Sequence, residues 1–369
     1  MGRDCGAAAL RAPSNAVGAL ALLAHLLSSV PAGGQGIASA QEGQGDGMDG
    51  IALVEGIRVG HFTYPDDPTG CTVVIADGGA VGGVDVRGGA PGTVETDLLD
   101  PVNTVSRVDA VFLSGGSAFG LDVRRGVMRH MEEVGQGFPV GASGVVPIVP
   151  GAIIFDLGVA GSRRPGPDCG YEAATRATGG AVAEGSVGAG AGATVGKMLG
   201  MEWAMKGGVG TSAVTLGSGL VVGALAVVNA VGDVVDPMTG AIIAGARTPE
   251  GGFADARRIV RGEYHPAEPG RNTTVAVVAT NAKLDKAQAT KVAQMAHDGL
   301  ARAIVPSHTP SDGDTVFSLA TGTLADAANV GQVGALAAEV LADAIVRAVR
   351  TARGLPSLPG VQDLESATR

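Results

Sequence analysis

An asparagine followed by two threonines marks a change in the character of the chain. The stretch GRNTTVAVVATNAKLD covers residues 270–285 and places Thr273 at the head of an expected strand, 274–280. A threonine hydroxyl is a poor nucleophile unless a base lies beside it, and a threonine at a chain terminus can use its own α-amine. Because Thr273 is internal, the chain would first have to be cut before it. Asn-Thr-Thr also matches a glycosylation acceptor, and the local sequence leaves both interpretations open.

The surroundings of Thr273 suit a self-cleavage reaction. Its hydroxyl could attack the carbonyl of Asn272, forming an ester that water then opens. Residues 238–271 are rich in Pro, Gly, Arg, Glu and Asp and lack a sustained apolar period, which predicts a long functional surface loop. The α-amine released by the cut would have a pKa of about 7.7–8 and would be partly unprotonated near neutrality.

Two other segments carry groups that could do chemistry. The glycine-rich run 184–197 lacks the glycine and the Ser or Thr that a phosphate loop needs, which favours close backbone packing over a nucleotide site. Lys197 ends this run, and we expect it to be partly buried. Asp312 and Asp314 could bind a cation or act as turn residues. The histidines form no metal pattern and no G-x-S-x-G motif is present, so we expect neither cofactor nor metal.

The composition excludes several classes of protein. A hydrophobic fraction of 45% supports a large core in a chain of 369 residues. The net charge of −10 and the lack of a basic cluster argue against nucleic-acid binding. Cys5, Cys71 and Cys169 are too few and too scattered for a disulfide framework or zinc site, so we expect thiols in a reducing, cytoplasmic setting.

The first 47 residues are expected to lie outside the fold. An apolar stretch at 16–30 and the sequence ASA at 38–40 resemble a signal peptide, which would make the protein an exported one if residues 1–40 serve that role. The alternative is an extended start before Met48, where folded-looking sequence begins. The apolar stretch is too short and interrupted for a membrane span, so we expect no membrane partner.

The remaining chain predicts layers of helix and strand without regular βαβ alternation. This pattern is typical of an α+β sandwich rather than a doubly wound sheet. Apolar spacing predicts helices at 117–135, 171–183, 285–304 with Asp285 as cap, and 333–349, and strands within 51–115, 145–158, 211–237, 274–280 and 308–322.

A series of motifs in order along the chain, from about 51 to 350, resembles the DmpA-type L-aminopeptidase/D-esterase family. They are RVGHF, GGAPGTVETDLLDP, LSGGSAFGLD, VPIVPGAIIFDL, GAGATVGK, AVVNAVGDVVDP, NTTVAVVATNA and AHDGLARAI with HTPSDGDTVFSLATG. That family includes β-peptidyl aminopeptidases and nylon-oligomer hydrolases. The resemblance implies an αββα sandwich of the N-terminal-nucleophile type, a single catalytic domain (48–369) cut into 48–272 and 273–369, and a homo-oligomer such as a tetramer.

The resemblance also implies roles for individual residues. The scissile bond falls at Asn272–Thr273, as in nylon-hydrolase-like members, and Thr273 is the nucleophile. Lys197 matches the lysine that ends the family's glycine-rich segment. Asn229 matches the asparagine that closes a strand and is an expected oxyanion donor.

The acidic pair and one departure complete the expected site. Asp312 and Asp314 are expected to bond the nucleophile's amine and to hold Lys197, which should therefore stay charged and stabilise negative charge more than act as a base. Several family members have tyrosine where this chain has Phe155, a substrate-site position, so any hydroxyl role there is lost.

The sequence therefore predicts a self-processing aminopeptidase or amidohydrolase that acts on short peptides, amides or esters through a threonine acyl-enzyme. Two alternatives are an acyl transferase like the ornithine acetyltransferases, whose motifs are not found here, and a binding protein that keeps the fold without processing. The motifs do not identify the substrate among L-aminoacyl, D-aminoacyl, β-aminoacyl and nylon-type amides.

Overall fold

The computed structural model describes residues 2, 50–267 and 272–367. The chain divides into two units, Met1–Glu42 and Gly43–Arg369, and the fold below is that of the second. The expected N-terminal extension, 1–47, lies outside the described residues apart from Gly2.

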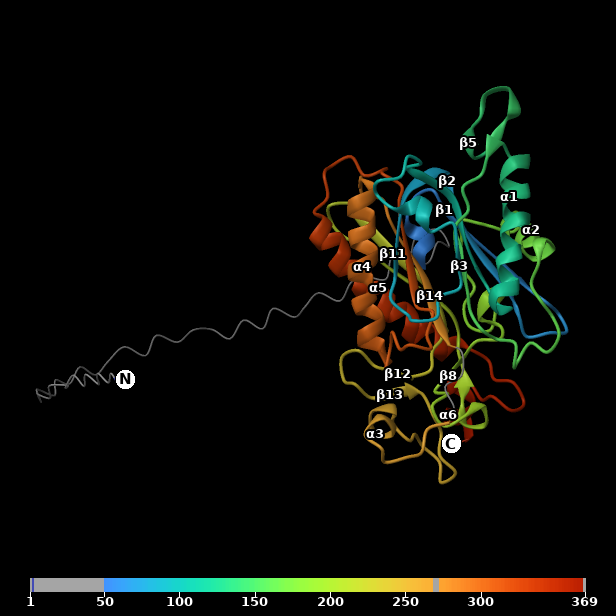
Figure 1. Ribbon diagram of the computed structural model, residues 1–369, viewed down its shortest axis with the longest axis vertical. Coiled ribbons are helices and arrows are strands. Elements are labelled where there is room, and N and C mark those ends of the chain that lie inside the picture. The colour runs from blue at the N-terminus through green and yellow to red at the C-terminus, as the bar shows by residue number, and fades with distance from the viewer. Residues whose placement is uncertain (1, 3–49, 268–271, 368–369) are drawn as a thin grey trace, which may run out of the picture. The chain divides into compact units, whose positions relative to one another are not determined.

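A nine-stranded sheet forms the centre of the folded unit (Figure 1). The strand order is β10-β11-β14-β16-β2-β4-β7-β3, with β1 paired to β2. The strands are β1 (Ile57–Thr63), β2 (Gly70–Val86), β3 (Thr93–Val94), β4 (Arg107–Ser114), β7 (Gly151–Ile153), β10 (Gly208–Thr215), β11 (Val221–Asn229), β14 (Thr273–Thr280) and β16 (Thr315–Ala320).

The long strand β2 joins two layers of this sheet. Its first half pairs with β1 and β4, its second half pairs with β16, and the register with β4 shifts between Ile75 and Ala80. Such an irregularity lets a strand bend and leave one layer for another. A buried cluster contains residues from both layers, among them Val74 of β2, Leu113 of β4 and Val277 of β14, so the two layers face each other.

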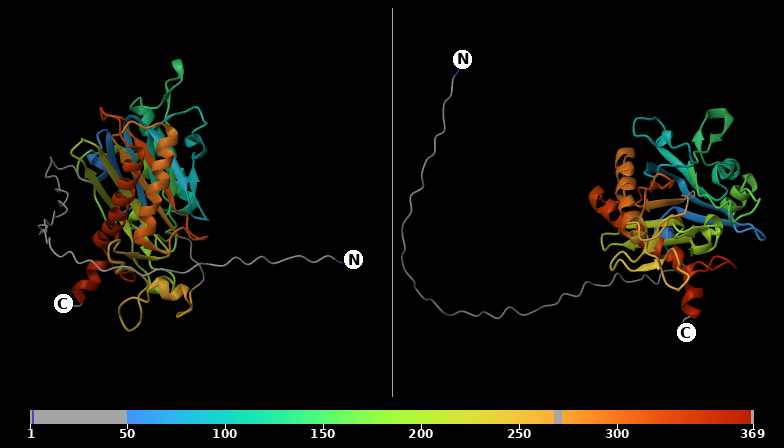
Figure 2. Two further views of the ribbon diagram at one scale, coloured as in Figure 1. Left: turned by 90° about the vertical axis from the view of Figure 1, so that its left-hand side faces the viewer. Right: turned by 60° about the horizontal axis from the view of Figure 1, so that its bottom comes forward.

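Helices cover the two outer faces of these layers. The alternation of β14 sends Val275 and Val277 into the inner cluster and Ala276 and Val278 toward α4 (Lys286–Ala303) and α5 (Val330–Thr351). On the other face, α1 (Val123–Glu133) and α2 (Pro167–Thr175) pack on β2 and β4. Figures 1 and 2 show the two helix pairs on opposite sides of the strands. The αββα sandwich predicted from the resemblance is confirmed.

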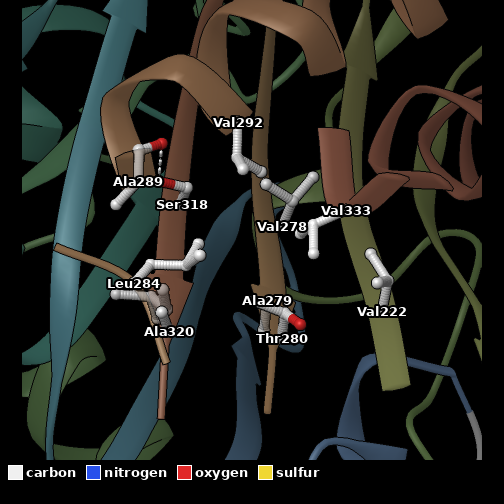
Figure 3. A pocket seen from close by; sticks show the side chains of 11 residues that line it. Val222, Val278, Ala279, Thr280, Leu284, Ala289, Val292, Ser318, Ala320 and Val333 are labelled. Atoms are coloured by element: carbon white, nitrogen blue, oxygen red, sulfur yellow. Dashed lines mark hydrogen bonds between the residues drawn. The ribbon is translucent and has the colours of Figure 1, made fainter. Parts of the chain in front are cut away.

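The interior beneath α4 and α5 is well filled. A cavity of only about 10 Å³ lies among Val222, Val278, Val292 and Val333 (Figure 3). The Ser318 hydroxyl, buried beside it, donates to the main-chain oxygen of Ala289 at 2.6 Å. Each fully buried valine stabilises the fold by roughly 1.5 kcal/mol or more relative to exposure. The packing of α4 and α5 therefore stabilises β14 on its outer face.

Most expected elements agree with the structure, with local corrections. Strand β14 begins at Thr273, and Asp285 caps α4 with a full capping box. The helix expected at 171–183 is instead α2, Pro167–Thr175, since Pro167 suits a helix start and the chain turns after Thr175.

The expected surface loop 238–271 also contains structure. It carries the short strand β13 (Ile242–Ala244), which pairs with β12 (Asp233–Val235), and the helix α3 (Ala256–Val260). Ala246, Ala254 and Ile259 form a small buried cluster there, too short for a periodicity to be recognised. Residues 268–271 lie outside the described part.

The expectation of free thiols is wrong for two of the three cysteines. Cys71 of β2 and Cys169 of α2 form a disulfide, although 98 residues separate them in sequence. The fold brings them together because α2 packs directly on β2, and spacing along the chain carries no sign of this contact. Among residues 50–267 and 272–367, no helix has the length and apolar character needed to cross a bilayer.

Candidate active site

Thr273 lies at the start of a central strand, where residues from several segments of the chain meet. It is the first residue of β14 and is directly opposite Asn229, the last residue of β11. On the other side β14 runs parallel to β16, and Val275 pairs with Thr315. Thr273 is only 4% exposed, so a hydroxyl at this position is shielded from bulk water. Strand β11 therefore pairs with Thr273 on one side, whereas pairing with β16 begins two residues later.

The Asn272–Thr273 peptide bond is held in a defined geometry. The Thr273 hydroxyl lies in hydrogen-bonding contact with the carbonyl oxygen of Asn272. The same carbonyl oxygen accepts the N–H of Gly313 at 3.0 Å, and the Asn272 N–H donates to the Ser311 carbonyl at 3.2 Å. An N–H aimed at a carbonyl oxygen stabilises negative charge that develops there. The arrangement can thus support attack of the hydroxyl on its own preceding carbonyl.

Gly313 owes its place to close packing around the nucleophile. A Cβ at this position would lie 2.9 Å from the Thr273 hydroxyl oxygen and 2.8 Å from the carbonyl oxygen of Ala90. The Ala90 N–H in turn donates to the Asp312 carbonyl at 2.8 Å. Only glycine therefore lets the 310–314 segment approach Thr273 this closely.

Lys197 reaches the site from the end of the glycine-rich segment. Its ammonium nitrogen donates to the main-chain oxygen of Asn229 at 2.9 Å and to the side-chain oxygen at 3.0 Å. The Thr194 N–H donates to that same side-chain oxygen at 3.0 Å, which identifies Oδ1, and Asn229 Nδ2 donates to the Phe155 carbonyl at 3.1 Å. Lys197 is thus hydrogen-bonded to Asn229, the residue directly opposite Thr273.

The electrostatics of Lys197 differ from those expected. Burial lowers the pKa of Lys197 to about 7, although Asp312 and Asp156 act in the opposite direction. The expectation that neighbouring carboxylates keep this lysine charged is wrong, because loss of hydration outweighs their attraction. Near neutrality Lys197 is present in both protonation states, so it can accept as well as donate a proton.

The acidic pair is present and buried, with contacts that differ from the expected ones. Asp314 Oδ1 accepts the Thr274 N–H at 2.7 Å, whereas Asp312 Oδ2 accepts the Thr309 N–H at 3.0 Å. In the described chain the hydrogen bonds of Lys197 go to Asn229 rather than to either carboxylate. Burial raises the pKa of Asp312, and the adjacent charge of Asp314 adds to the increase. Asp312 Oδ1 has no hydrogen-bond partner among the described residues.

A hollow of about 460 Å³ opens next to the nucleophile. Phe155, Asn272 and Thr273 line it together with Ser117, whose φ of 55° is unusual for a residue with a side chain. The other lining residues are Ala90, Pro91, Gly92, Ala118, Ile153 and Ser311. Apart from Asn272, the lining is apolar or hydroxyl-bearing, so the hollow can receive a small acyl group.

Sequence reasoning missed several buried polar residues around the site. Lys206 is fully buried, and its ammonium nitrogen donates to the carbonyls of Gly190, Ala191 and Ala193 in the glycine-rich segment. Burial lowers the pKa of Lys206 to about 7. Asp156 follows Phe155 directly and binds the Thr69 hydroxyl at 2.6 Å. A charged residue inside an apolar run was the available signal for both.

Known proteins are similar to this chain over most of its length. A model of peptidase family S58 matches residues 49–362. An uncharacterized aminopeptidase of Mycobacterium tuberculosis is 46% identical over 346 residues, which are 86% of this chain and 98% of the relative. A 6-aminohexanoate-oligomer endohydrolase of Kocuria sp. is 28% identical over 319 residues, covering 80% of this chain and 84% of that protein.

Solved structures show the same fold. A beta-aminopeptidase of Burkholderia sp. has a TM-score of 0.64 at 24% identity, covering 87% of this chain and 94% of the other. The L-aminopeptidase D-Ala-esterase/amidase of Ochrobactrum anthropi, described as a variant of the Ntn hydrolase fold, has a TM-score of 0.65 at 17% identity and covers 86% and 92%. At these identities the likeness concerns the fold alone.

Proposed function

The chain belongs to peptidase family S58, a family of hydrolases, and we propose that it is a self-processing aminopeptidase or amidohydrolase with Thr273 as its nucleophile. The observation that carries the proposal is the contact between the Thr273 hydroxyl and the Asn272 carbonyl, which also accepts the Gly313 N–H. A nucleophile and an oxyanion donor already meet at one peptide bond. The relatives described above are named as hydrolases, which favours hydrolysis over acyl transfer.

In the first reaction the chain is its own substrate. The Thr273 oxygen bonds to the Asn272 carbonyl carbon, and the carbonyl oxygen becomes negative beside the Gly313 N–H. The C–N bond then breaks, the Thr273 nitrogen takes a proton and becomes an amine, and an ester links the two residues. Water hydrolyses the ester, which gives a chain ending at Asn272 and a chain beginning at Thr273.

Lys197 is the group that we assign to proton transfer in this reaction. The nitrogen of an internal Thr273 is an amide and cannot act as a base, so another group must accept the hydroxyl proton. With a pKa of about 7, Lys197 is partly neutral at physiological pH and can accept the proton and pass it to the leaving nitrogen. Its hydrogen bonds to both oxygens of Asn229 fix its position next to this residue, which is directly opposite Thr273.

In the mature enzyme the new α-amine of Thr273 supplies its own base. The α-amine takes the hydroxyl proton as the oxygen attacks the substrate carbonyl, and passes it to the departing amine or alcohol; water then hydrolyses the ester and releases the acyl group from the enzyme. An asparagine amide has two N–H donors. One from Asn229 goes to the Phe155 carbonyl, and we assign the other to the oxyanion together with the Gly313 N–H. Asp312 Oδ1 is the proposed acceptor for the terminal ammonium.

The proposed substrates are short peptides, amides or esters with a small acyl group. The hollow that adjoins Thr273 measures about 460 Å³, and Asn272 lines it in the uncut chain, which supports this hollow as the place where later acyl groups bind. Relatives named for aminopeptidase and for 6-aminohexanoate-oligomer hydrolysis fit amide substrates. We further propose one catalytic domain, 48–369, whose two chains stay together in a homo-oligomer.

Intact-mass measurement and N-terminal sequencing of the purified protein test the proposal. The smaller chain should begin at Thr273 and contain 369 − 272 = 97 residues. Thr273→Ala should stay as one full-length chain and hydrolyse no aminoacyl p-nitroanilide. Cleavage of Thr273→Ala at the same bond would mean that an external protease makes the cut, and the proposed mechanism would be wrong.

A further inference from the structure

His308 is connected to the residue after the nucleophile through Asp314, and no motif assigned it a role. Its main-chain N–H and its ring Nδ1 both lie 2.9 Å from Asp314 Oδ2. Since a carboxylate oxygen accepts hydrogen bonds, Nδ1 carries the hydrogen in this contact. The backbone of His308 has a φ of 57°, a left-handed conformation that histidine and asparagine adopt more readily than most residues. This conformation lets one residue direct two donors to one oxygen.

Asp314 transmits this contact to the nucleophile strand. Its other oxygen, Oδ1, accepts the Thr274 N–H at 2.7 Å. Strand pairing between β14 and β16 begins only at Val275 and Thr315, so the Asp314 side chain replaces the next ladder bond. The carboxylate is 2% exposed and lies between the residue after Thr273 and the ring of His308. The position of Thr273 thus depends on how firmly Asp314 is held.

The ring of His308 is itself supported from α4. His297 is fully buried, its Nε2 lies 3.0 Å from the Asp85 carbonyl, and its ring meets that of His308 edge to face at 4.8 Å. Because the Asp85 carbonyl can only accept, Nε2 of His297 carries its hydrogen. A chain of contacts therefore runs from β2 through two histidines to the residue after the nucleophile.

We infer that His308 is a positioning residue for the threonine nucleophile, acting through its Nδ1–H on Asp314. The inference rests on the proposed function, because it requires Thr273 to be the reacting group. His308 does not touch the Asn272–Thr273 bond in this geometry. It fixes the carboxylate that fixes the Thr274 amide, and so it sets the direction in which the Thr273 hydroxyl points.

Two substitutions at His308 distinguish the effect of the hydrogen-bond donor's position from the effect of side-chain size. In His308→Asn the amide nitrogen takes the place of Nδ1, and asparagine tolerates the left-handed backbone. In His308→Gln the amide nitrogen reaches the place of Nε2 instead. The first-order rate constant of precursor cleavage is measured by intact mass in a cell-free translation time course. For matured enzyme, kcat and KM are measured on an aminoacyl p-nitroanilide that the wild type hydrolyses.

His308→Asn should process within about threefold of the wild-type rate, whereas His308→Gln should be slower by at least roughly tenfold, with kcat lowered and KM unchanged. A purely structural role would lower the amount of folded precursor but not its rate constant. Equal rates for the two variants, whether fast or slow, would overturn the inference. His61→Gln, at a partly buried histidine that contacts Thr72 in β2, is the matched control and should process normally.

Thr273→Ala is run in the same series. If it is cleaved, the proposed function fails. If it stays uncut while His308→Gln matures at the wild-type rate with normal kcat, only the role of His308 is wrong. The two failures are therefore distinguishable.

Discussion

Asn229 and Thr273 are directly opposed residues of the antiparallel strands β11 and β14. Opposed residues in such a ladder lie with their Cα atoms about 4.5–5.5 Å apart. Lys197 donates to both oxygens of Asn229, so one strand pair brings the lysine and the amide to the threonine. The sheet register sets the spacing of Asn229 and Thr273, and the hydrogen bonds of Lys197 to Asn229 bring the lysine to this pair from the end of the glycine-rich segment.

Replacing the lysine should slow processing without unfolding the protein. Lys197→Met removes the ammonium group while keeping a long side chain, so we expect precursor cleavage to slow by at least roughly tenfold, about 1.4 kcal/mol on the barrier. Lys286→Met is the matched control, because burial also lowers the pKa of Lys286 and its ammonium nitrogen contacts the backbone carbonyls of Leu98 and Asn103, outside the site. Time-resolved gels should show normal cleavage in folded Lys286→Met. Equal slowing in both would argue against a specific role for Lys197.

The rate of self-cleavage should depend on pH in one direction. Neutral Lys197 is the form that accepts a proton, and its pKa is about 7. The first-order rate constant should therefore rise by up to about tenfold per pH unit below pH 7 and level off above it. The measurement is the cleavage of purified precursor transferred from acid into buffers from pH 5.5 to 9. A rate that falls with rising pH would show that charged Lys197 is the active form.

Stability should rise with pH above neutrality because of the buried lysines Lys197 and Lys206. In the folded protein the pKa values of Lys197 and Lys206 are lowered from 10.5 to about 7, so between pH 7 and 10.5 the unfolded chain binds more protons. The free energy of unfolding then increases with pH across this window, by on the order of 1 kcal/mol per pH unit for each lysine. Urea unfolding of Thr273→Ala at pH 7, 8 and 9 measures the slope. Adding Lys206→Met to that background should reduce it by about half.

The disulfide should be detectable by thiol counting. Cys71 and Cys169 both precede Asn272, so the bond would not link the two products of the proposed self-cleavage. A loop closed over this many residues is worth roughly 4 kcal/mol or more in the chain-entropy model. We expect one reactive thiol, from Cys5, in full-length denatured protein and three after reduction. The reduced protein should also have a lower melting temperature than the oxidised protein. Three thiols before reduction would restore the original expectation of free cysteines.

The sequence predicted the fold class because motifs in order carried the resemblance, and apolar periodicity marked strand β14 and helix α4 correctly. The proposed roles of the site residues come from the same motifs and remain predictions. It did not predict the state of Lys197. That state depends on how much water the folded chain removes from one ammonium group, which neighbouring residue types alone do not reveal. The Cys71–Cys169 contact was missed because it arises from packing between elements distant in sequence. The contacts of His308 with Asp314 and His297 were missed because they depend on the left-handed backbone of His308 and on its packing against α4, which no motif indicates.

Gly313 provides the most direct test of the geometry at the scissile bond. Its N–H donates to the Asn272 carbonyl at 3.0 Å, and a Cβ there would lie 2.9 Å from the Thr273 hydroxyl oxygen. In Gly313→Ala the methyl group must displace either the Thr273 hydroxyl or the 310–314 segment. Displacing the segment lengthens the hydrogen bond from the residue 313 N–H to the Asn272 carbonyl. Removing one oxyanion donor costs roughly 100-fold or more in rate.

We therefore expect Gly313→Ala to accumulate as uncut precursor, with cleavage at least roughly 100-fold slower than in the wild type. Gly217→Ala is the matched control, since it lies in an exposed turn where a Cβ meets nothing within 4 Å. Circular dichroism and thermal melting should show that both variants are folded. A folded Gly313→Ala precursor that matures at the wild-type rate would mean that the Gly313 N–H does not stabilise the oxyanion, and another donor, with Asn229 the first candidate, would have to do so.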